Sequence, residues 1–236
     1  MSGSADFVVS VIIPVYNGAR HLWETVTSAL VQTQPPCEIL VVDDGSTDES
    51  AAVIQQMAAT SAIPIRYSYQ TNGGPGAARN KGIALASGGL VAFLDQDDLW
   101  LENKLARQVQ LFQDAPDVDI VVTQQVYFLA DGFACPPWVR PELLDRPVSA
   151  MTPSTLMVRR HLFNQIGTFS EKLLAASDAD WFFRAKDAGI VIAAVSEVLV
   201  KHRIHSQNQS RMVARSHMEL LALVQQSVRR KQMQSL

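Results

Sequence analysis

Two clusters of acidic residues in the first 100 positions of the chain each follow an apolar run. The first is Asp43-Asp44, and the second is Asp95-Gln96-Asp97-Asp98, which places three carboxylates within four residues. Such carboxylates repel one another unless a cation or hydrogen-bond donors compensate their charge. In an extended chain Asp95 and Asp97 would point the same way, and paired oxygen ligands suit Mg²⁺ or Mn²⁺, which also bind phosphates. The second cluster therefore favours a divalent metal site.

Both clusters also allow an interpretation in which the carboxylates only shape the backbone. Gly45 can supply the positive φ of a turn, and Ser46 to Asp48 can cap a following helix. Asp98 can be the N-cap or first-turn acid of a helix that begins near Leu101. The turn does not explain two adjacent carboxylates at Asp43-Asp44, so both interpretations stay open there. In the second cluster, capping accounts for Asp98 alone.

The chain alternates between Val- and Ile-rich runs and segments with apolar residues at helical spacing. Continuous apolar runs predict buried strands, and helical spacing predicts helices. This alternation predicts an α/β fold with a mostly parallel central sheet and helices on both faces. Ligands bind such sheets beyond the carboxyl ends of the strands, where both acidic clusters fall. The predicted strands are residues 7–15, 37–42, 63–69, 90–94, 118–129, 155–158 and 190–200, and the predicted helices are 22–30, 51–59, 77–86, 101–112, 178–188 and 212–234.

Ala130 to Pro153 interrupts this rhythm and is expected to form a long loop. It holds five prolines and has no periodic pattern, and long loops in compact domains are usually functional or mobile. Phe133, Trp138 and Arg140 could form the wall of an acceptor site. A proline-stiffened surface loop is the alternative, and both stay open.

Composition limits the classes of protein that the chain can be. With 236 residues, 47% of them hydrophobic, it is long enough for one large domain, alone or with a small appendage. A net charge of −3 argues against nucleic acid as a partner. Two cysteines cannot supply a disulfide scaffold or a four-ligand zinc site. No signal peptide and no apolar run near the ~20 residues of a membrane span are found, so a cytoplasmic protein is expected.

Six blocks of the sequence resemble the motifs of glycosyltransferase family 2, and they occur in the order and at the spacings usual in that family. The resemblance covers roughly residues 7 to 210 and implies a GT-A fold. It divides residues 1–210, the glycosyltransferase domain, into a Rossmann-like nucleotide-sugar-binding half (7–98) and an acceptor half (99–210). Residues 211–236 would form a helical tail. The blocks are Val9–Asn17, Val41–Asp48, Gly73–Ile83, Phe93–Asp98, Ser177–Trp181 and Arg203–His205.

The resemblance implies a nucleotide pocket built from the first three blocks. Pro14, Tyr16 and Asn17 match family positions that line this pocket. Asp44 matches a position that contacts the base, and Arg79 matches one near the base and ribose. Without the family, Arg79 would be interpreted as an ordinary arginine on a helix surface. The implied donor is a nucleotide-diphosphate sugar, with uridine diphosphate as the expected carrier on family frequency.

The fourth and sixth blocks imply a site for Mn²⁺ or Mg²⁺. Asp95 matches the ribose-side acid, Gln96 stands beside it in the donor site, and Asp97 matches the direct metal ligand that orients the diphosphate. His205 matches a position near the metal and the diphosphate. Taken alone, His205 would more often be a surface or locally hydrogen-bonded histidine.

The fifth block implies a catalytic carboxylate, Asp178. The family pair there is Glu-Asp, whereas this chain has Ser177-Asp178, which puts acceptor positioning in question. The acceptor hydroxyl needs a general base, and a divalent ion stabilises the diphosphate that leaves. One base and no evident protein nucleophile predict a single displacement with inversion. Without the family, Asp178 would be a helix-start acid favoured by the helix dipole.

Two other functions remain as alternatives. A sugar nucleotidyltransferase should have a glycine-rich, basic loop after the first strand, where this chain has Val15-Tyr16-Asn17-Gly18. A non-catalytic nucleotide-sugar-binding domain would have no need of Asp97 or Asp178. A dinucleotide-binding dehydrogenase is excluded because no Gly-x-Gly-x-x-Gly follows a strand.

The expected partners are the donor and an acceptor hydroxyl on a saccharide or another molecule, with lipid- and peptide-linked acceptors both open. The Gln-x-x-Arg-Trp motif of processive synthases is missing. In the tail, Arg229, Arg230 and Lys231 follow an apolar stripe. That pattern leaves peripheral contact with the inner face of a membrane open, beside the alternative of a helix packed on the core. The oligomeric state is also open.

Overall fold

A nine-stranded sheet runs through the residues that the structure describes, which are 7–173, 175–208 and 213–234 of a computed structural model. The strands are β1 (Val9–Val15), β2 (Glu38–Asp43), β3 (Ile65–Tyr69), β4 (Leu90–Phe93), β5 (Leu99–Trp100), β6 (Ile120–Leu129), β7 (Val148–Ser149), β8 (Met157–Arg159) and β9 (Ile192–Ile204). Their order is β3-β2-β1-β4-β8-β6-β9-β5, with β7 paired to β6 outside this path. Strands β1 to β4 pair in parallel, as do β6 and β9, whereas β8, β5 and β7 run antiparallel to their neighbours.

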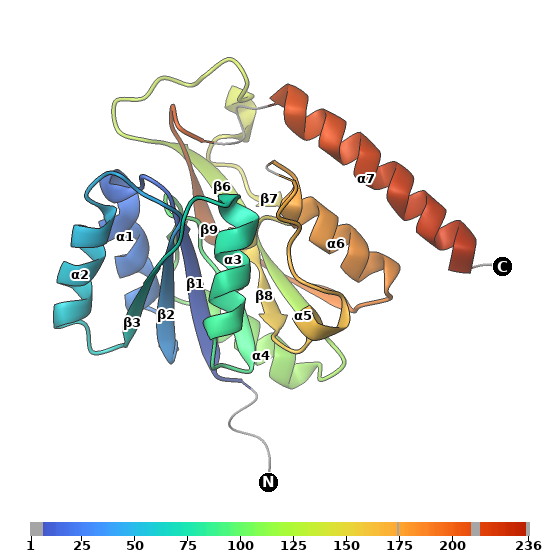
Figure 1. Ribbon diagram of the computed structural model, residues 1–236, viewed down its shortest axis with the longest axis horizontal. Coiled ribbons are helices and arrows are strands. Elements are labelled where there is room, and N and C mark those ends of the chain that lie inside the picture. Colours follow the sequence, from blue (N-terminus) through green and yellow to red (C-terminus); the bar gives the residue numbers. More distant parts are fainter. Residues whose placement is uncertain (1–6, 174, 209–212, 235–236) are drawn as a thin grey trace, which may run out of the picture.

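Helices cover both faces of the sheet (Figure 1). They are α1 (Ala19–Leu30), α2 (Ser50–Thr60), α3 (Gly74–Leu85), α4 (Lys104–Asp114), α5 (Leu162–Gln165), α6 (Ser177–Asp187) and α7 (Val213–Gln234), with short 3-10 turns η1 (Pro141–Leu143) and η2 (Pro153–Thr155). Apolar side chains of α1, α2 and α4 form one core cluster with the sheet, and those of α3, α5 and α6 form a second. The predicted α/β class, with a mostly parallel sheet between two helical layers, is confirmed.

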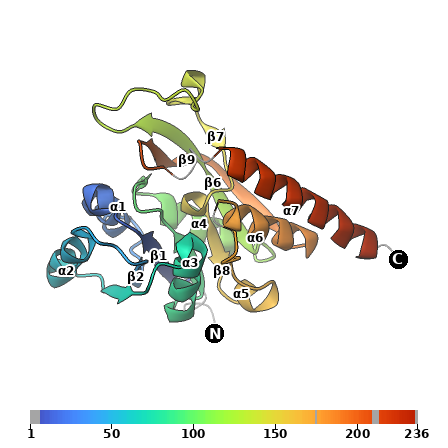
Figure 2. The ribbon, with the colours of Figure 1, turned by 45° about the horizontal axis from the view of Figure 1, so that its top comes forward.

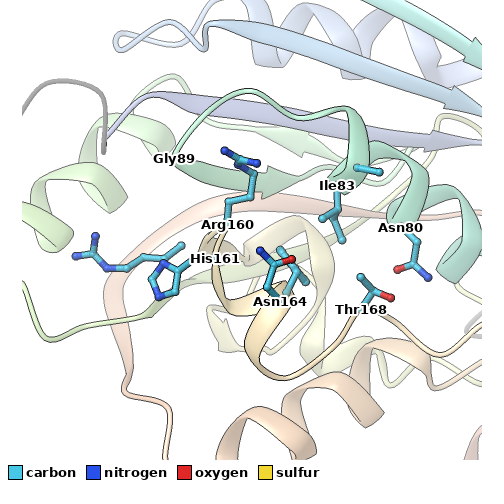
Figure 3. A pocket seen from close by; sticks show the side chains of 10 residues that line it. Asn80, Ile83, Gly89, Arg160, His161, Asn164 and Thr168 are labelled. Atoms are coloured by element: carbon cyan, nitrogen blue, oxygen red, sulfur yellow. The ribbon is translucent and has the colours of Figure 1, made fainter.

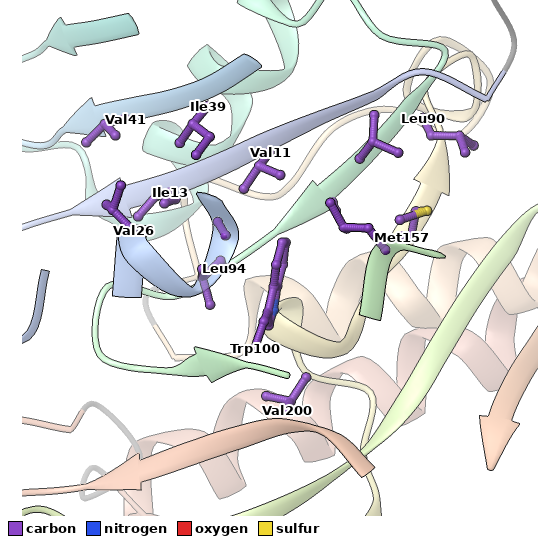
Figure 4. Close-up of a cluster of buried hydrophobic side chains, with 14 of the residues drawn as sticks. Val11, Ile13, Val26, Ile39, Val41, Leu90, Leu94, Trp100, Met157 and Val200 are labelled. Atoms are coloured by element: carbon purple, nitrogen blue, oxygen red, sulfur yellow. The ribbon is translucent and has the colours of Figure 1, made fainter. Parts of the chain in front are cut away.

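The first strand shows why a continuous apolar run is needed between two helical layers. Every residue of β1 is buried, and side chains alternate between the two faces of a strand. Val11 and Ile13 belong to the cluster with α1, and Figure 4 shows Ile13 beside Val26. Ile12 belongs to the other cluster, and there Gly82 of α3 lies so close that an added Cβ would be 2.4 Å from the Ile12 Cγ2 atom.

Three local predictions differ from the structure. Leu99–Trp100 forms the two-residue strand β5, so the predicted helix at residue 101 begins only at Lys104. The stretch from Ala130 to Pro153 is mostly loop but contains η1 and β7. The short helix α5 was not predicted. Strands from residues 7–98 and from residues 99–210 share one sheet, because β8 pairs with β4.

The predicted tail helix is present as α7, and Met212 lies outside the described residues. Figures 1 and 2 show α7 beside α6, on the side of α6 that faces away from the sheet. Leu223 is buried there, and the Ser227 hydroxyl and Arg230 Nε donate to the Asp187 carboxylate at 2.7 and 2.8 Å. In the part of the chain that the structure describes, no helix has the length and apolar character to span a membrane.

Candidate active site

The two acidic clusters meet at the edge of the sheet where β1, β2 and β4 end. β1 lies between β2 and β4 and runs parallel to both. The chain therefore leaves β1 toward β2 on one side and returns, after β3, to β4 on the other side. Such a reversal of strand order opens a crevice at the carboxyl ends of the strands. Asp43-Asp44 and Asp95 to Asp98 reach this edge, which lies at the top of the sheet in Figure 1.

Gln96 ties the end of β1 to the end of β4. The Tyr16 amide N–H donates to Gln96 Oε1 at 2.8 Å, and Gln96 Nε2 donates to the Tyr16 carbonyl at 3.2 Å. A Cβ on Gly18 would lie 2.4 Å from Gln96 Oε1, so glycine at position 18 leaves room for the Gln96 side chain. Tyr16 itself is 50% exposed. Pro14 is buried within β1 just beneath it.

Asp43 supports the turn that follows β2. Its carboxylate accepts hydrogen bonds from the Ser46 amide N–H at 2.7 Å and from the Tyr67 hydroxyl at 2.6 Å. Burial and the Asp43 carboxylate raise the pKa of Tyr67, so this phenol remains a donor. Gly45 adopts a φ of +84°, as the turn interpretation predicts. Asn17 fixes the facing loop, because its side-chain oxygen accepts from the Thr47 amide N–H at 2.8 Å.

Asp44 holds the start of α3. One carboxylate oxygen accepts from the Gly73 amide N–H and the other from the Gly74 amide N–H, each at 2.8 Å. The Gln70 side chain donates to the same carboxylate at 2.8 Å. An anion at a helix N-terminus is favoured by the free N–H groups and the helix dipole. Asp44 thus has a structural role at the start of α3, which the turn interpretation did not include, and its contact with a base stays a prediction.

Arg79, Asp95 and Asp178 form a charged group between α3, the end of β4 and the start of α6. Arg79 is buried, and its Nη2 donates to Asp95 Oδ1 at 2.7 Å, so the interpretation as a surface arginine is wrong. The Arg79 Nε atom is buried without a partner among the described residues. Burial raises the pKa of Asp178 and the Asp95 charge adds to this, while the Arg79 charge opposes it. Nearby Asp180 is instead bonded to Arg184 Nε at 2.9 Å.

Asp97 and His205 form the second charged group. His205 Nε2 lies 2.7 Å from Asp97 Oδ2, and His205 is buried, so the alternative of a surface histidine is wrong, whereas that of a locally hydrogen-bonded histidine is confirmed. The Gln207 amide N–H donates to His205 Nδ1 at 3.1 Å, which leaves the proton of a neutral ring on Nε2, facing Asp97. Asn208 holds the same loop by accepting from the His205 amide N–H at 2.5 Å. The neighbouring His21 ring has a buried Nε2 with no partner in the described structure.

Asp98 is an interior residue, and the prediction that it caps a helix is wrong. It is fully buried, and its carboxylate accepts from the Ser154 hydroxyl at 2.6 Å and from the Arg203 amide N–H at 3.1 Å. His202 Nδ1 lies 3.0 Å away. Asp98 therefore joins the end of β4 to β9 and to η2. The premise of an extended chain also fails, because a turn at residues 96–97 sends Asp95 toward α3 and Asp97 toward His205.

The donor atoms of Asp97 and His205 fit a divalent cation of the Mn²⁺ type. Asp97 Oδ2 and His205 Nε2 lie 2.7 Å apart, and Mn²⁺ accepts both an oxygen and an imidazole nitrogen, whereas Mg²⁺ prefers oxygen alone. To ligate through Nε2, the neutral His205 ring would carry its proton on Nδ1, so its hydrogen bonds with Asp97 and Gln207 would both be replaced. Across the described residues, no three or more His, Cys, Asp and Glu side chains are grouped as a metal site. A cation here would therefore need further oxygens, which a diphosphate and water can supply.

A cavity of about 540 Å³ lies away from this edge and contains none of these carboxylates (Figure 3). Arg160, His161 and Asn164 line it, together with Asn80 and Thr168. It sits beside Gly89, at the amino end of β4, and so at the opposite end of that strand from Asp95. The candidate site is the group of acidic residues at the carboxyl ends of β1, β2 and β4.

Sequence reasoning missed several residues that are distant in sequence but hold the Asp95 to Asp98 segment in place through hydrogen bonds. Ser154, His202, Arg203 and Asn208 all bond to the Asp95 to Asp98 segment or to its partners. Arg203 Nε donates to the Asp97 carbonyl at 2.9 Å, and its Nη2 donates to Glu24 at 2.6 Å. The only available signal was the Arg203–His205 block itself.

The fold is of the α/β class, with the acidic residues gathered at the carboxyl ends of its parallel strands. The sequence profile described as Glycosyl transferase family 2 matches residues 10–170. The chain therefore belongs to glycosyltransferase family 2, and its sheet and helices are those of the GT-A fold.

Individual proteins agree with this assignment. The chain is 30% identical over 224 residues to an uncharacterized glycosyltransferase of Rickettsia conorii, covering 90% of this chain but 36% of that relative. S. aureus TarS 1–349, solved in complex with UDP-GlcNAc, is 26% identical, with a TM-score of 0.69 over 87% of this chain and 61% of that one. The Pyrobaculum calidifontis mannosyltransferase PcManGT, solved with GDP-Man and Mn²⁺, shares the fold at 20% identity, with a TM-score of 0.74 over 94% of this chain and 64% of that one. The chain thus spans less than two thirds of each of these proteins.

Proposed function

We propose that the protein transfers a sugar from a nucleotide-diphosphate sugar to an acceptor hydroxyl, with inversion at the anomeric carbon. The observation that carries this proposal is the arrangement of two separate charged groups at one crevice. Asp97 and His205 offer an oxygen and a nitrogen 2.7 Å apart, and Asp178 stands beside the Arg79–Asp95 pair. Family membership supports the reaction class.

The first charged group suits the leaving diphosphate. Asp97 and His205 would hold a divalent cation, and Pro14, Tyr16 and Asn17 would line the nucleotide pocket. When bound, the cation supplies charge that stabilises the diphosphate oxygens. Arg203 fixes Asp97 in place through its carbonyl.

The second charged group suits proton removal from the acceptor. Asp178 lies in the first turn of α6, and burial raises its pKa, which makes its anion a better base. Arg79 and Asp95 keep the surrounding charge balanced, because each carboxylate there has the guanidinium as a neighbour. With one base and no nucleophile assigned, the sugar is transferred in a single displacement.

One further observation supports the choice of donor nucleotide, and another supports the place of the acceptor site. UDP is the proposed carrier, because TarS, at 26% identity, was solved with UDP-GlcNAc. The loop of residues 130–153, which contains Trp138, lies at the same edge of the sheet as the crevice (Figure 1). We infer that this loop forms one wall of the acceptor site.

A thermal-shift panel of nucleotides and nucleotide sugars, each with and without Mn²⁺, tests the proposal. A ligand at about 100 times its Kd should stabilise the folded state by about 2.7 kcal/mol. The same panel on Asp97→Ala should lose the Mn²⁺-dependent part of the shift. The Asn164→Ala variant, in the cavity at the other end of β4, is the matched control and should respond like the parent. A chain that responds to no nucleotide under any metal condition would refute donor binding.

A further inference from the structure

The helix α7 has two chemically different long faces. Toward α6 it buries Leu223 and Ser227. The opposite face presents Met218, Leu221, Val224 and Val228 with exposed fractions between 46% and 69%. Their spacing of three, three and four residues places them in one row along the helix. Single exposed apolar residues are common, but a continuous row is a mark of an interaction surface.

The charge of α7 is opposite to that of the rest of the protein. By sequence, α7 has four basic residues and one acidic residue, so it carries +3, whereas the whole chain carries −3. The rest of the chain therefore carries −6. The one carboxylate, Glu219, accepts a hydrogen bond from the Ala175 amide N–H on the protein side. Arg229 is exposed, near the end of the apolar row. Arg230 is instead paired with Asp187 of α6, so Arg229 is the basic side chain shown to be exposed beside the row. An apolar row that ends at a basic group is complementary to an anionic amphipathic surface.

We propose that α7 docks the protein on an anionic lipid bilayer. The four apolar side chains would enter the boundary between headgroups and acyl chains, and Arg229 would lie among the anionic headgroups. The remaining chain, with its net charge of −6, would be held away from the surface. The docking is peripheral, since no described helix can span a membrane.

A second copy of the chain fits this face less well. In a two-fold dimer the same patch faces itself, so two helices of charge +3 would lie against each other. A row of four side chains over three helical turns is also well short of the roughly 800 Å² that each partner buries in a stable interface. This inference rests on charge and exposure alone and does not depend on the proposed function.

Vesicle sedimentation tests the proposal with the full chain. The parent protein should bind vesicles of phosphatidylcholine and phosphatidylglycerol at least about tenfold more tightly than vesicles of phosphatidylcholine, and salt should weaken the binding. The double variant Leu221→Glu/Val224→Glu should lose at least about tenfold in this affinity. Val31→Glu is the matched control, because Val31 is a similarly exposed apolar residue elsewhere, directly after the end of α1.

Three results would overturn the docking surface. One is equal binding of the parent to neutral and anionic vesicles. Another is a double variant that binds like the parent while circular dichroism shows an unchanged fold. The third is a dimer in sedimentation velocity without lipid that Leu221→Glu/Val224→Glu dissociates, because that would assign the face to a second copy of the chain.

Discussion

His202 should make the folded protein less stable as the pH rises from about 6.5 to about 9. Burial by itself lowers the pKa of its imidazole, but the Asp98 charge and the hydrogen bond with Asp98 outweigh this and raise the pKa to about 9. An unfolded histidine titrates near 6.5. Between these values the folded state therefore holds a proton that the unfolded chain has released. The resulting stabilisation is complete below about pH 6.5 and is lost as the pH rises through about 9.

The size of the effect follows from the interval between the two pKa values. At about 1.4 kcal/mol for each pH unit, the interval from about 6.5 to about 9 corresponds to about 3.5 kcal/mol of unfolding free energy, of which about 3 kcal/mol is lost between about pH 6 and about pH 9.5. The His202 side chain is 18% exposed and Asp98 is fully buried, so solvent screens this ion pair only weakly.

Urea unfolding at about pH 6, 7.5 and 9.5 measures this effect. The difference in unfolding free energy between the parent and His202→Gln should shrink by about 3 kcal/mol across this range. Using the difference removes the contributions of the other histidines. His161→Gln, at an exposed position, serves as the control substitution of a histidine away from Asp98. If the gap between the parent and His202→Gln stays constant with pH, the assigned ion pair is wrong.

Three further substitutions test other parts of the structure. Gly82→Ala should lower the unfolding free energy by about 1–3 kcal/mol, because its Cβ would meet Ile12; an unchanged urea midpoint would contradict the close approach. Ser154→Ala removes a hydroxyl that accepts from the Asp95 amide N–H and donates to Asp98. This substitution should weaken Mn²⁺ binding by about tenfold in a metal titration, and an unchanged affinity would show that Ser154 does not position the metal ligands. Trp138→Ala should raise the KM for the acceptor and leave slow donor hydrolysis near normal, whereas equal loss of both activities would move Trp138 out of the acceptor wall.

The strands that carry the site could be predicted because their signal is local. β1, β2 and β4 are short runs of apolar residues buried on both faces, and a parallel sheet demands this pattern. The position of the site then follows from topology, since acidic residues after neighbouring strands meet at one edge. The positive φ of Gly45 was likewise predictable from its turn.

The partners of the acidic residues could not be predicted in the same way. Asp98 follows a strand and precedes a helix, as a capping residue would, yet its partners Ser154 and His202 are 56 and 104 residues away in sequence. β5 has only two residues and exists because Leu99 and Trp100 pair with β9. Lys104, at the start of α4, is fully buried, with its Nζ 4.1 Å from the centre of the Trp100 ring. Tertiary contacts decided each of these outcomes.

The rate of sugar transfer by Asp178→Asn tests the central claim most directly. This substitution keeps the shape of the side chain and removes its basicity, so it isolates proton removal from the acceptor. With donor and Mn²⁺ saturating, the rate should fall by about 10²–10⁴-fold, while calorimetry shows a donor affinity within a few-fold of the parent. Asp97→Ala should instead lose Mn²⁺-dependent donor affinity. An Asp178→Asn protein that transfers sugar at nearly the parental rate would contradict the assignment of Asp178 as the base.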